Sequence, residues 1–126
     1  MKVEARVEAL GVLYADDRNP ERLAEDSLSA KASRFVEGVR AHSEEIDAAI
    51  NAAAIDWRVE RMAAVDRNVL RIAVYELGWT DTPRAVVMNE AVEMAKTYST
   101  TKSGSFVNGV LDKVVKNLDE TETPEE

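Results

Sequence analysis

The sequence contains no cysteine, and only three prolines and five glycines among its 126 residues. The lack of cysteine excludes disulfide bonds and thiolate metal ligands. The scarcity of proline and glycine removes the residues that most often interrupt helices. No apolar run approaches the roughly 18 residues of a membrane-spanning helix, and the N-terminus lacks the basic start and apolar core of a signal peptide. These absences predict a helical, cytoplasmic protein with no membrane partner.

Acidic residues outnumber basic ones, 24 to 16, and give a net charge of −8. The last eight residues, DETETPEE, carry five acidic side chains, so the rest of the chain holds only −3 of the −8. We predict one helical domain over residues 1–118 and an acidic, disordered tail over residues 119–126. A mildly acidic domain leaves room for a local basic face, which binding to nucleic acid requires.

Apolar residues recur with a helical period almost throughout, and no strand alternation of useful length is present. In the first segment, Val3, Val7 and Leu10 form a stripe that Tyr14 completes. The pattern predicts an all-α bundle of about seven helices. The expected helices cover Lys2 to Ala15, a segment after Pro20, Ala30 to His42, a segment capped by Ser43 and ending near Ala53, Ala64 to Trp79, Ala85 to Tyr98, and a last helix from Ser103 or Ser105 through Leu118.

Three details of packing follow from the same pattern. Trp57 and Met62 lie in a short link between two helices and are expected to fill the core. Gly109 adjoins the apolar stripe of the last helix, where a missing side chain would let another helix approach closely. Charged residues beside apolar stripes are seldom buried alone, so we expect internal ion pairs at three positions. These positions are Arg71, Glu76 and Glu90.

Three strings occur in a fixed order in the C-terminal two-thirds of the chain. They are ERMAAVDRNVLRIAVYEL (Glu60 to Leu77), MNEAVEMAKTYS (Met88 to Ser99) and SGSFVNGVLDKV (Ser103 to Val114). In this order and spacing they resemble the NusB family of transcription antitermination factors. The N-terminal string RVEALGVLYADD is similar to the first helix of that family.

The resemblance implies two packed three-helix groups, no catalysis and no cofactor. It also implies binding of a short single-stranded RNA element, boxA, together with the small-subunit ribosomal protein NusE, so that the transcription elongation complex reads through terminators in ribosomal RNA operons. The chain departs from the family at its start, where a cluster of arginines is usual. Here MKVEARVEAL offers only Lys2 and Arg6, interleaved with Glu4 and Glu8.

RNA binding needs cations for the phosphate backbone and flat side chains on which unstacked bases can lie. Lys2 and Arg6 share one face of the first helix, and the N-terminus of the last helix favours a phosphate through its free N–H groups and dipole. By resemblance, the loop before the last helix and the tyrosine end of the first helix form one surface. The candidate RNA-binding residues are Lys2, Arg6, Tyr14, Lys96, Lys102, Ser103, Ser105 and Phe106.

Each of these candidates has a structural alternative. Tyr14 and Phe106 are equally suited to the core, and the lysines are equally suited to ordinary solvated positions. By resemblance, the charged face with Asp66, Arg67 and Tyr75 binds the protein partner, although Asp66 could instead cap its helix. No set of residues in the sequence predicts a metal site.

An enzyme is not expected. His42 is the only histidine, and neither a phosphate-binding glycine loop nor a nucleophile elbow is present. A small-molecule substrate is therefore not expected either. The alternative to RNA binding is a helical protein-interaction module with weak or lost RNA affinity. A third possibility, the NusB-like front domain of RNA cytosine methyltransferases, would need a second domain. The acidic tail could also compete with RNA for the cations.

Overall fold

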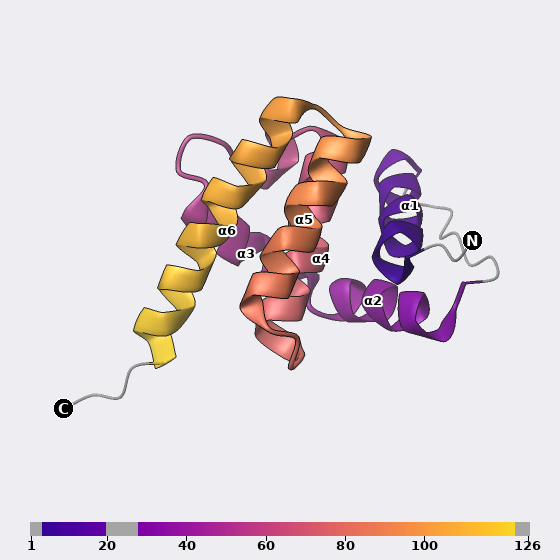
Figure 1. The fold of residues 1–126 in the computed structure, drawn as a ribbon, viewed down its shortest axis with the longest axis horizontal. Helices are drawn as coiled ribbons and strands as arrows, with labels where there is room; N and C mark the ends of the chain where they lie inside the picture. The colour runs from indigo at the N-terminus through magenta and orange to yellow at the C-terminus, as the bar shows by residue number, and fades with distance from the viewer. Residues whose placement is uncertain (1–3, 20–27, 123–126) are drawn as a thin grey trace.

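The chain folds into six α-helices and one short 3₁₀ helix within residues 4–19 and 28–122, the part that this computed structural model describes. No strand occurs in those ranges, so the predicted all-α class is confirmed. The helix expected after Pro20 falls outside the described residues. The elements are α1 (Ala5–Arg18), α2 (Ala30–Ala41), α3 (Ser43–Ala53), η1 (Val59–Arg61), α4 (Ala64–Trp79), α5 (Arg84–Tyr98) and α6 (Thr101–Glu122) (Figure 1).

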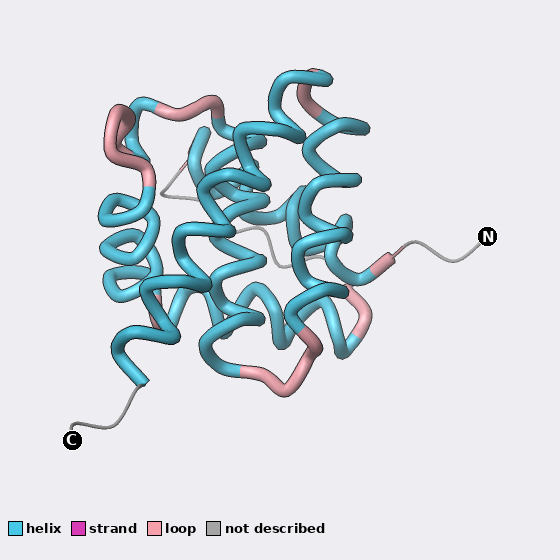
Figure 2. Tube along the Cα trace, turned by 60° about the vertical axis from the view of Figure 1, so that its left-hand side comes forward, coloured by secondary structure: helices cyan, strands magenta, loops and turns pink. Residues whose placement is uncertain are grey.

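The helix α4 is the centre of the bundle. It contacts α1, α2, α3, α5 and α6, and the helices α4, α5 and α6 pack against one another as a three-helix group. The helix α1 packs on α2, and α3 joins that second group to α4 and α6 (Figures 1 and 2). The predicted arrangement of two packed three-helix groups is therefore confirmed. Fully buried side chains from several helices fill the space between the groups, including Ile46, Ile50, Leu70, Ile72 and Leu111. Within the described ranges, no helix is both long and apolar enough to cross a membrane.

Local capping explains where the prediction of helix ends differs from the structure. The helix α1 begins at Ala5 because the carboxylate of Glu4 accepts the backbone N–H of Arg6 at 2.9 Å. The helix α6 begins at Thr101, not at Ser103 or Ser105. Its cap is Thr100, whose hydroxyl accepts the backbone N–H of Ser103 at 3.1 Å.

The helix α6 also continues beyond the predicted end of the domain. It ends at Glu122, so residues 119–122 of the expected disordered tail are helical, and residues 123–126 lie outside the described part. Asp119 forms an ion pair at 2.7 Å with Arg84, the first residue of α5. This pair connects the end of α6 to the start of α5, at a residue that the sequence composition assigned to a disordered tail.

An ion pair joins α1 to α4 inside the bundle. The guanidinium of Arg6 donates from Nε and Nη2 to the two carboxylate oxygens of Glu76 at 2.7 and 2.8 Å, and their side chains are only 8% and 2% exposed. The hydrogen bonds to Glu76 outweigh the effect of burial and raise the pKa of Arg6 above its usual value. The negative charge of Glu90 acts in the same direction. The expected internal ion pair of Glu76 is confirmed.

A second ionic cluster fixes the other end of α1. Asp17 accepts hydrogen bonds from Arg67 at 2.8 Å, from Asn68 at 2.7 Å and from Arg71 at 3.2 Å. Arg71 also pairs with Asp47 of α3 at 2.9 Å, which confirms its expected internal ion pair. The cluster therefore ties α1, α3 and α4 together at one end of α4.

The link between α3 and α4 differs from the prediction in one residue. Met62 is buried, as expected, but the side chain of Trp57 is 53% exposed and does not fill the core. Ile55, two residues earlier, is 81% exposed. The prediction for Trp57 is wrong because the backbone N–H of Val59 bonds to Asn51 at 2.8 Å and Val59 occupies the buried position.

The explanation proposed for Gly109 is also wrong, because within α6 it is Gly104 that lies at a close helix contact. A Cβ on Gly104 would lie 2.6 Å from Cγ of Lys96, whereas a Cβ on Gly109 would meet nothing within 4 Å. Both glycines lie inside α6. Gly109 therefore has the helix-propensity cost of glycine without a packing reason within the described part of the chain.

We expect Gly109→Ala to raise the free energy of unfolding by up to about 1 kcal/mol, because alanine is the better helix former. Gly104→Ala is the matched control, since the same change there must displace the Lys96 side chain and gains less or destabilises. Urea denaturation of the two variants measures both values. A loss of stability in Gly109→Ala would contradict the open surroundings seen here.

Candidate RNA-binding surface

Two lysines flank the N-terminal end of α6. The stem of Lys96, from α5, lies over Gly104, and its Nζ is 3.8 Å from a carboxylate oxygen of Glu93, with both side chains at least half exposed. Lys102 is exposed in the first turn of α6. Successive helical residues are about 100° apart, so Lys102 shares one side of α6 with Phe106, and Gly104 faces the other side. One cation therefore lies on each flank of the helix end.

Ser103 lies between the two lysines but faces inward. It is only 6% exposed, and its Oγ is 3.0 Å from Oδ2 of Asp66, 2.9 Å from the hydroxyl of Ser99 and 3.1 Å from that of Thr100. A hydroxyl donates one proton, and the carboxylate can only accept, so Ser103 donates to Asp66. This bond fastens the start of α6 to the start of α4. Ser103 was expected to face a phosphate, and its burial removes it from the exposed surface, whereas Ser105 is exposed.

Tyr14 lies at the end of α1 that approaches the α5–α6 connection. It lines a hollow of about 260 Å³ together with Tyr98, the last residue of α5, which is 49% exposed. The guanidinium of Arg18 lies 5.7 Å from the ring centroid of Tyr14, which places an exposed cation over an aromatic face. Sequence reasoning missed Arg18, although the spacing of four residues from Tyr14 was a signal for it.

Arg6 lies at the opposite end of α1 from this surface. It was expected to be an exposed RNA contact, but it is 6% exposed and bound to Glu76. Glu76 and Asp66 are ten residues apart on α4, which is about 15 Å along the helix axis. The burial and position of Arg6 remove it from the candidate surface. Lys2 lies outside the described residues.

The three residues expected to bind a protein partner do not share a face. Asp66 is buried and bonds to Ser103, and Arg67 binds Asp17 together with the backbone carbonyls of Glu60 and Met62. The ring of Tyr75 packs against Gly38 of α2 and lies edge-on to Phe35 at 6.2 Å. Asp66, Arg67 and Tyr75 thus hold α4 to α6, α1 and α2 respectively, and they form no single exposed charged surface.

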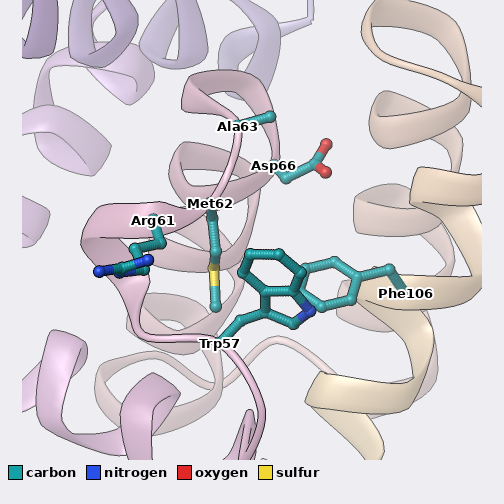
Figure 3. A pocket seen from close by; sticks show the side chains of 6 residues that line it. All are labelled: Trp57, Arg61, Met62, Ala63, Asp66 and Phe106. Atoms are coloured by element: carbon teal, nitrogen blue, oxygen red, sulfur yellow. The ribbon is translucent and has the colours of Figure 1, made fainter.

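Phe106 separates two pockets beside the α3–α4 link. The first has a volume of about 200 Å³ and is lined by Trp57, Arg61, Met62, Ala63, Asp66 and Phe106 (Figure 3). The second, of about 370 Å³, shares Trp57 and Phe106 and extends along α6 past Ser105 and Gly109. Phe106 is half-buried, so one part of its ring packs on the core and the other faces these pockets.

No group of three or more acidic or histidine side chains within the described ranges could hold a metal ion. The ring of His42 stacks on the ring of Trp79, with the two centroids 4.3 Å apart. The geometry described above is that of a surface with cations and aromatic rings, contributed by α1, α5, α6 and the α3–α4 link.

The sequence model of the NusB family matches residues 4–116, which is most of the chain. The chain belongs to the NusB family. Among the curated NusB proteins, the transcription antitermination protein NusB of Anaeromyxobacter sp. (strain Fw109-5) is 46% identical, over 93% of this chain and 91% of that protein. NusB proteins are transcription antitermination factors, and the chain shares both the sequence and the all-α fold of this family.

Solved NusB structures superpose over nearly the whole chain. T. maritima NusB gives a TM-score of 0.80 at 31% identity, covering 98% of this chain and 100% of that one. A crystal structure of the antitermination factors NusB and NusE in complex with double-stranded RNA gives 0.78 at 30% identity, covering 90% of this chain and 94% of that one. The similarity to solved NusB structures therefore extends from α1 to α6.

Proposed function

We propose that this NusB family member binds boxA-type single-stranded RNA together with ribosomal protein NusE and promotes read-through by the transcription elongation complex in ribosomal RNA operons. A relative solved with NusE and double-stranded RNA supports NusE and RNA as the partners. The observation that carries the proposal is the meeting of the Tyr14 end of α1 with the end of α5 that leads into α6.

The proposed RNA surface consists of exposed cations and half-exposed rings around that meeting point. We call it the α6 surface, and its residues are Tyr14, Arg18, Lys96, Tyr98, Lys102, Ser105 and Phe106. The cations would hold phosphates, and the rings would stack with unpaired bases. The N–H groups at the start of α6 favour a phosphate as well. Arg18 is the arginine of α1 that we propose as an RNA contact, in the role that the sequence suggested for Arg6.

RNA and NusE are proposed to bind cooperatively. If each ligand strengthens the other by a shared coupling free energy, a modest set of cations suffices for useful RNA affinity in the complex. This matters for a chain with a net charge of −8, since RNA affinity depends on the local cations and on salt.

We expect Lys102→Glu to lower the affinity for a boxA-type RNA about tenfold in the presence of NusE, and to flatten the salt dependence by about one unit of slope. The affinity for NusE alone stays unchanged. Fluorescence anisotropy with labelled RNA at several salt concentrations measures both quantities. Lys113→Glu is the matched control, because Lys113 is exposed on α6 about 16 Å further along the helix.

Equal losses in Lys102→Glu and Lys113→Glu would mean that only the net charge matters, and would contradict a defined α6 surface. The alternative function is a helical interaction module with weak RNA affinity, and the burial of Arg6 favours it. That alternative predicts NusE binding with no salt-sensitive RNA affinity in the same titrations.

A further inference from the structure

The pocket beneath Trp57 contains a buried acceptor that lacks a hydrogen-bond donor. Asp66 is 9% exposed, and its Oδ1 is shielded from solvent without a hydrogen-bond partner within the described part of the chain. Its other oxygen, Oδ2, accepts the hydroxyl of Ser103 at 3.0 Å. A buried carboxylate oxygen without a donor costs stability, since burial removes its bonds to water. The fold alone gives no reason for that cost.

The surroundings of Asp66 are suited to a flat ring. The rings of Trp57 and Phe106 both line the pocket that Asp66 lines (Figure 3). The pocket of about 200 Å³ is too small for a large ligand but accommodates one aromatic heterocycle. Base stacking on aromatic side chains is a general mode of binding single-stranded RNA.

Cations accompany the rings on both sides. Arg61 lines the pocket from η1, and Lys102 lies one turn before Phe106 on the same side of α6. Both side chains are exposed. A base in the pocket would therefore have its phosphates near positive charge, whereas a neutral aromatic side chain of a protein partner would gain nothing from these cations. This complementarity favours a nucleotide as the occupant.

We propose that the pocket receives one unstacked base of the bound RNA, and that Oδ1 of Asp66 selects a base with an exocyclic amino group. This inference deepens the RNA-binding function proposed above and rests on it. Adenine, cytosine and guanine each present an amino group that can donate to Oδ1. Uracil has no amino group, and the carbonyl oxygens beside its N–H repel a carboxylate.

Entry of the base requires one side chain to move, because Oδ1 is closed to solvent in the free protein. Trp57 is the exposed wall of the pocket, and its outward rotation opens the way. The indole then stacks on the incoming base. Binding should accordingly quench the fluorescence of Trp57, which can be followed alone in a Trp79→Phe background, since the chain has two tryptophans.

The test compares three labelled single-stranded RNAs, the 12-mers of adenosine, cytidine and uridine, with the full chain in the presence of NusE. For the wild type we expect the adenosine or cytidine 12-mer to bind about tenfold more tightly than the uridine 12-mer, the scale of one hydrogen bond to a charged group. Asp66→Asn replaces the free oxygen by an amide that can donate, because Ser103 still donates to the amide oxygen. That variant should lose the preference or favour uridine.

The ratio of the affinities is the decisive quantity, since removing one negative charge strengthens all three RNAs alike. Lys102→Glu is the comparison, because it should weaken all three and leave the ratio unchanged. Trp57→Ala is a second variant that the fold tolerates at an exposed position, and it should also reduce the ratio. Thermal unfolding and circular dichroism establish that each variant is folded.

The outcomes separate the two proposals. If neither these RNAs nor a boxA-type RNA binds at any salt concentration, RNA binding itself is refuted. If only the boxA-type RNA binds, the α6 surface stands and the base pocket is refuted. If all three bind, but the wild type shows no preference or Asp66→Asn keeps the preference, the α6 surface stands and the base pocket is refuted. A preference that depends on Asp66 and Trp57 supports the pocket.

Discussion

Replacing Arg6 with alanine is expected to lower the free energy of unfolding by about 3–5 kcal/mol, the cost of leaving one partner of a buried ion pair alone. Glu76 would remain as a carboxylate that is 2% exposed, with neither of its two bonds to Arg6. A domain of this kind has a total stability of about 5–15 kcal/mol, so the loss is a large part of it. Urea denaturation followed by circular dichroism measures the change.

The double variant Arg6→Met with Glu76→Leu is the control. It removes both charges and fills the space with apolar side chains, so we expect it to recover most of the loss. Recovery would show that the damage in Arg6→Ala comes from an unpaired buried charge. A loss below 1 kcal/mol in Arg6→Ala would contradict the burial of this pair and would return Arg6 to the exposed surface. RNA affinity of the folded double variant should equal that of the wild type.

Asp17→Ala is expected to have the second largest effect, a loss of about 2 kcal/mol, because three donors from α4 lose their acceptor. The pair with Arg67 is about one-fifth exposed, so solvent moderates the loss relative to Arg6. Burial of Asp17 acts to raise its pKa, but the hydrogen bonds from Arg67 and Asn68 and the charge of Arg71 outweigh burial. The pKa is therefore lowered from the ordinary value of 3.8.

The lowered pKa gives the effect a pH dependence with a definite sign. The folded state holds the ionised carboxylate more strongly than the unfolded state does. The stabilisation is therefore complete above the ordinary pKa of 3.8 and is lost as pH falls through the lower pKa of the folded protein. Asp17→Asn cannot titrate, so the stability difference between wild type and this variant should shrink as the pH falls from about 5 to about 2. A difference that stays constant over this range would contradict the ion pairs of Asp17.

The sequence was sufficient for the elements that are fixed by local periodicity and by the family motifs. The range Ala64 to Trp79 was predicted at both ends, because its apolar spacing is regular and Thr80 and the following residues stop it. The start of α6 at Thr101 was missed, since Thr100 acts as the cap while the more obvious candidates, Ser103 and Ser105, follow it. Several polar residues in a row leave the choice of cap undecided until the backbone is known.

The cationic face of α1 could not be predicted in the same way. Helical spacing placed Lys2 and Arg6 on one side of the helix. Arg6 is buried there because it pairs with Glu76, which is seventy residues away in the sequence. Arg18 shows the converse, because ending the helix at Ala15 hid its contact with the Tyr14 ring. The exposed arginine of α1 is therefore Arg18 near its end, and not Arg6 near its start, for reasons of long-range pairing and helix length.

The pocket at Trp57 depended on tertiary structure as well. A tryptophan in a short link usually packs inward, and only the bond from Val59 to Asn51 shows why it does not here. The neighbouring aspartate was assigned to a partner face by resemblance, and its contact with Ser103 joins two helices whose starts are 37 residues apart. No spacing rule within either helix reveals that contact.

The length of α6 separates the carboxylates near its end from Lys102 at its start. From Lys102 to Glu122 the helix rises about 30 Å, which places its last turn at the far side of the molecule from the lysines. Asp119 and Glu120 therefore lie more than about 20 Å along the helix axis from Lys102, too far to occupy the phosphate positions beside that lysine.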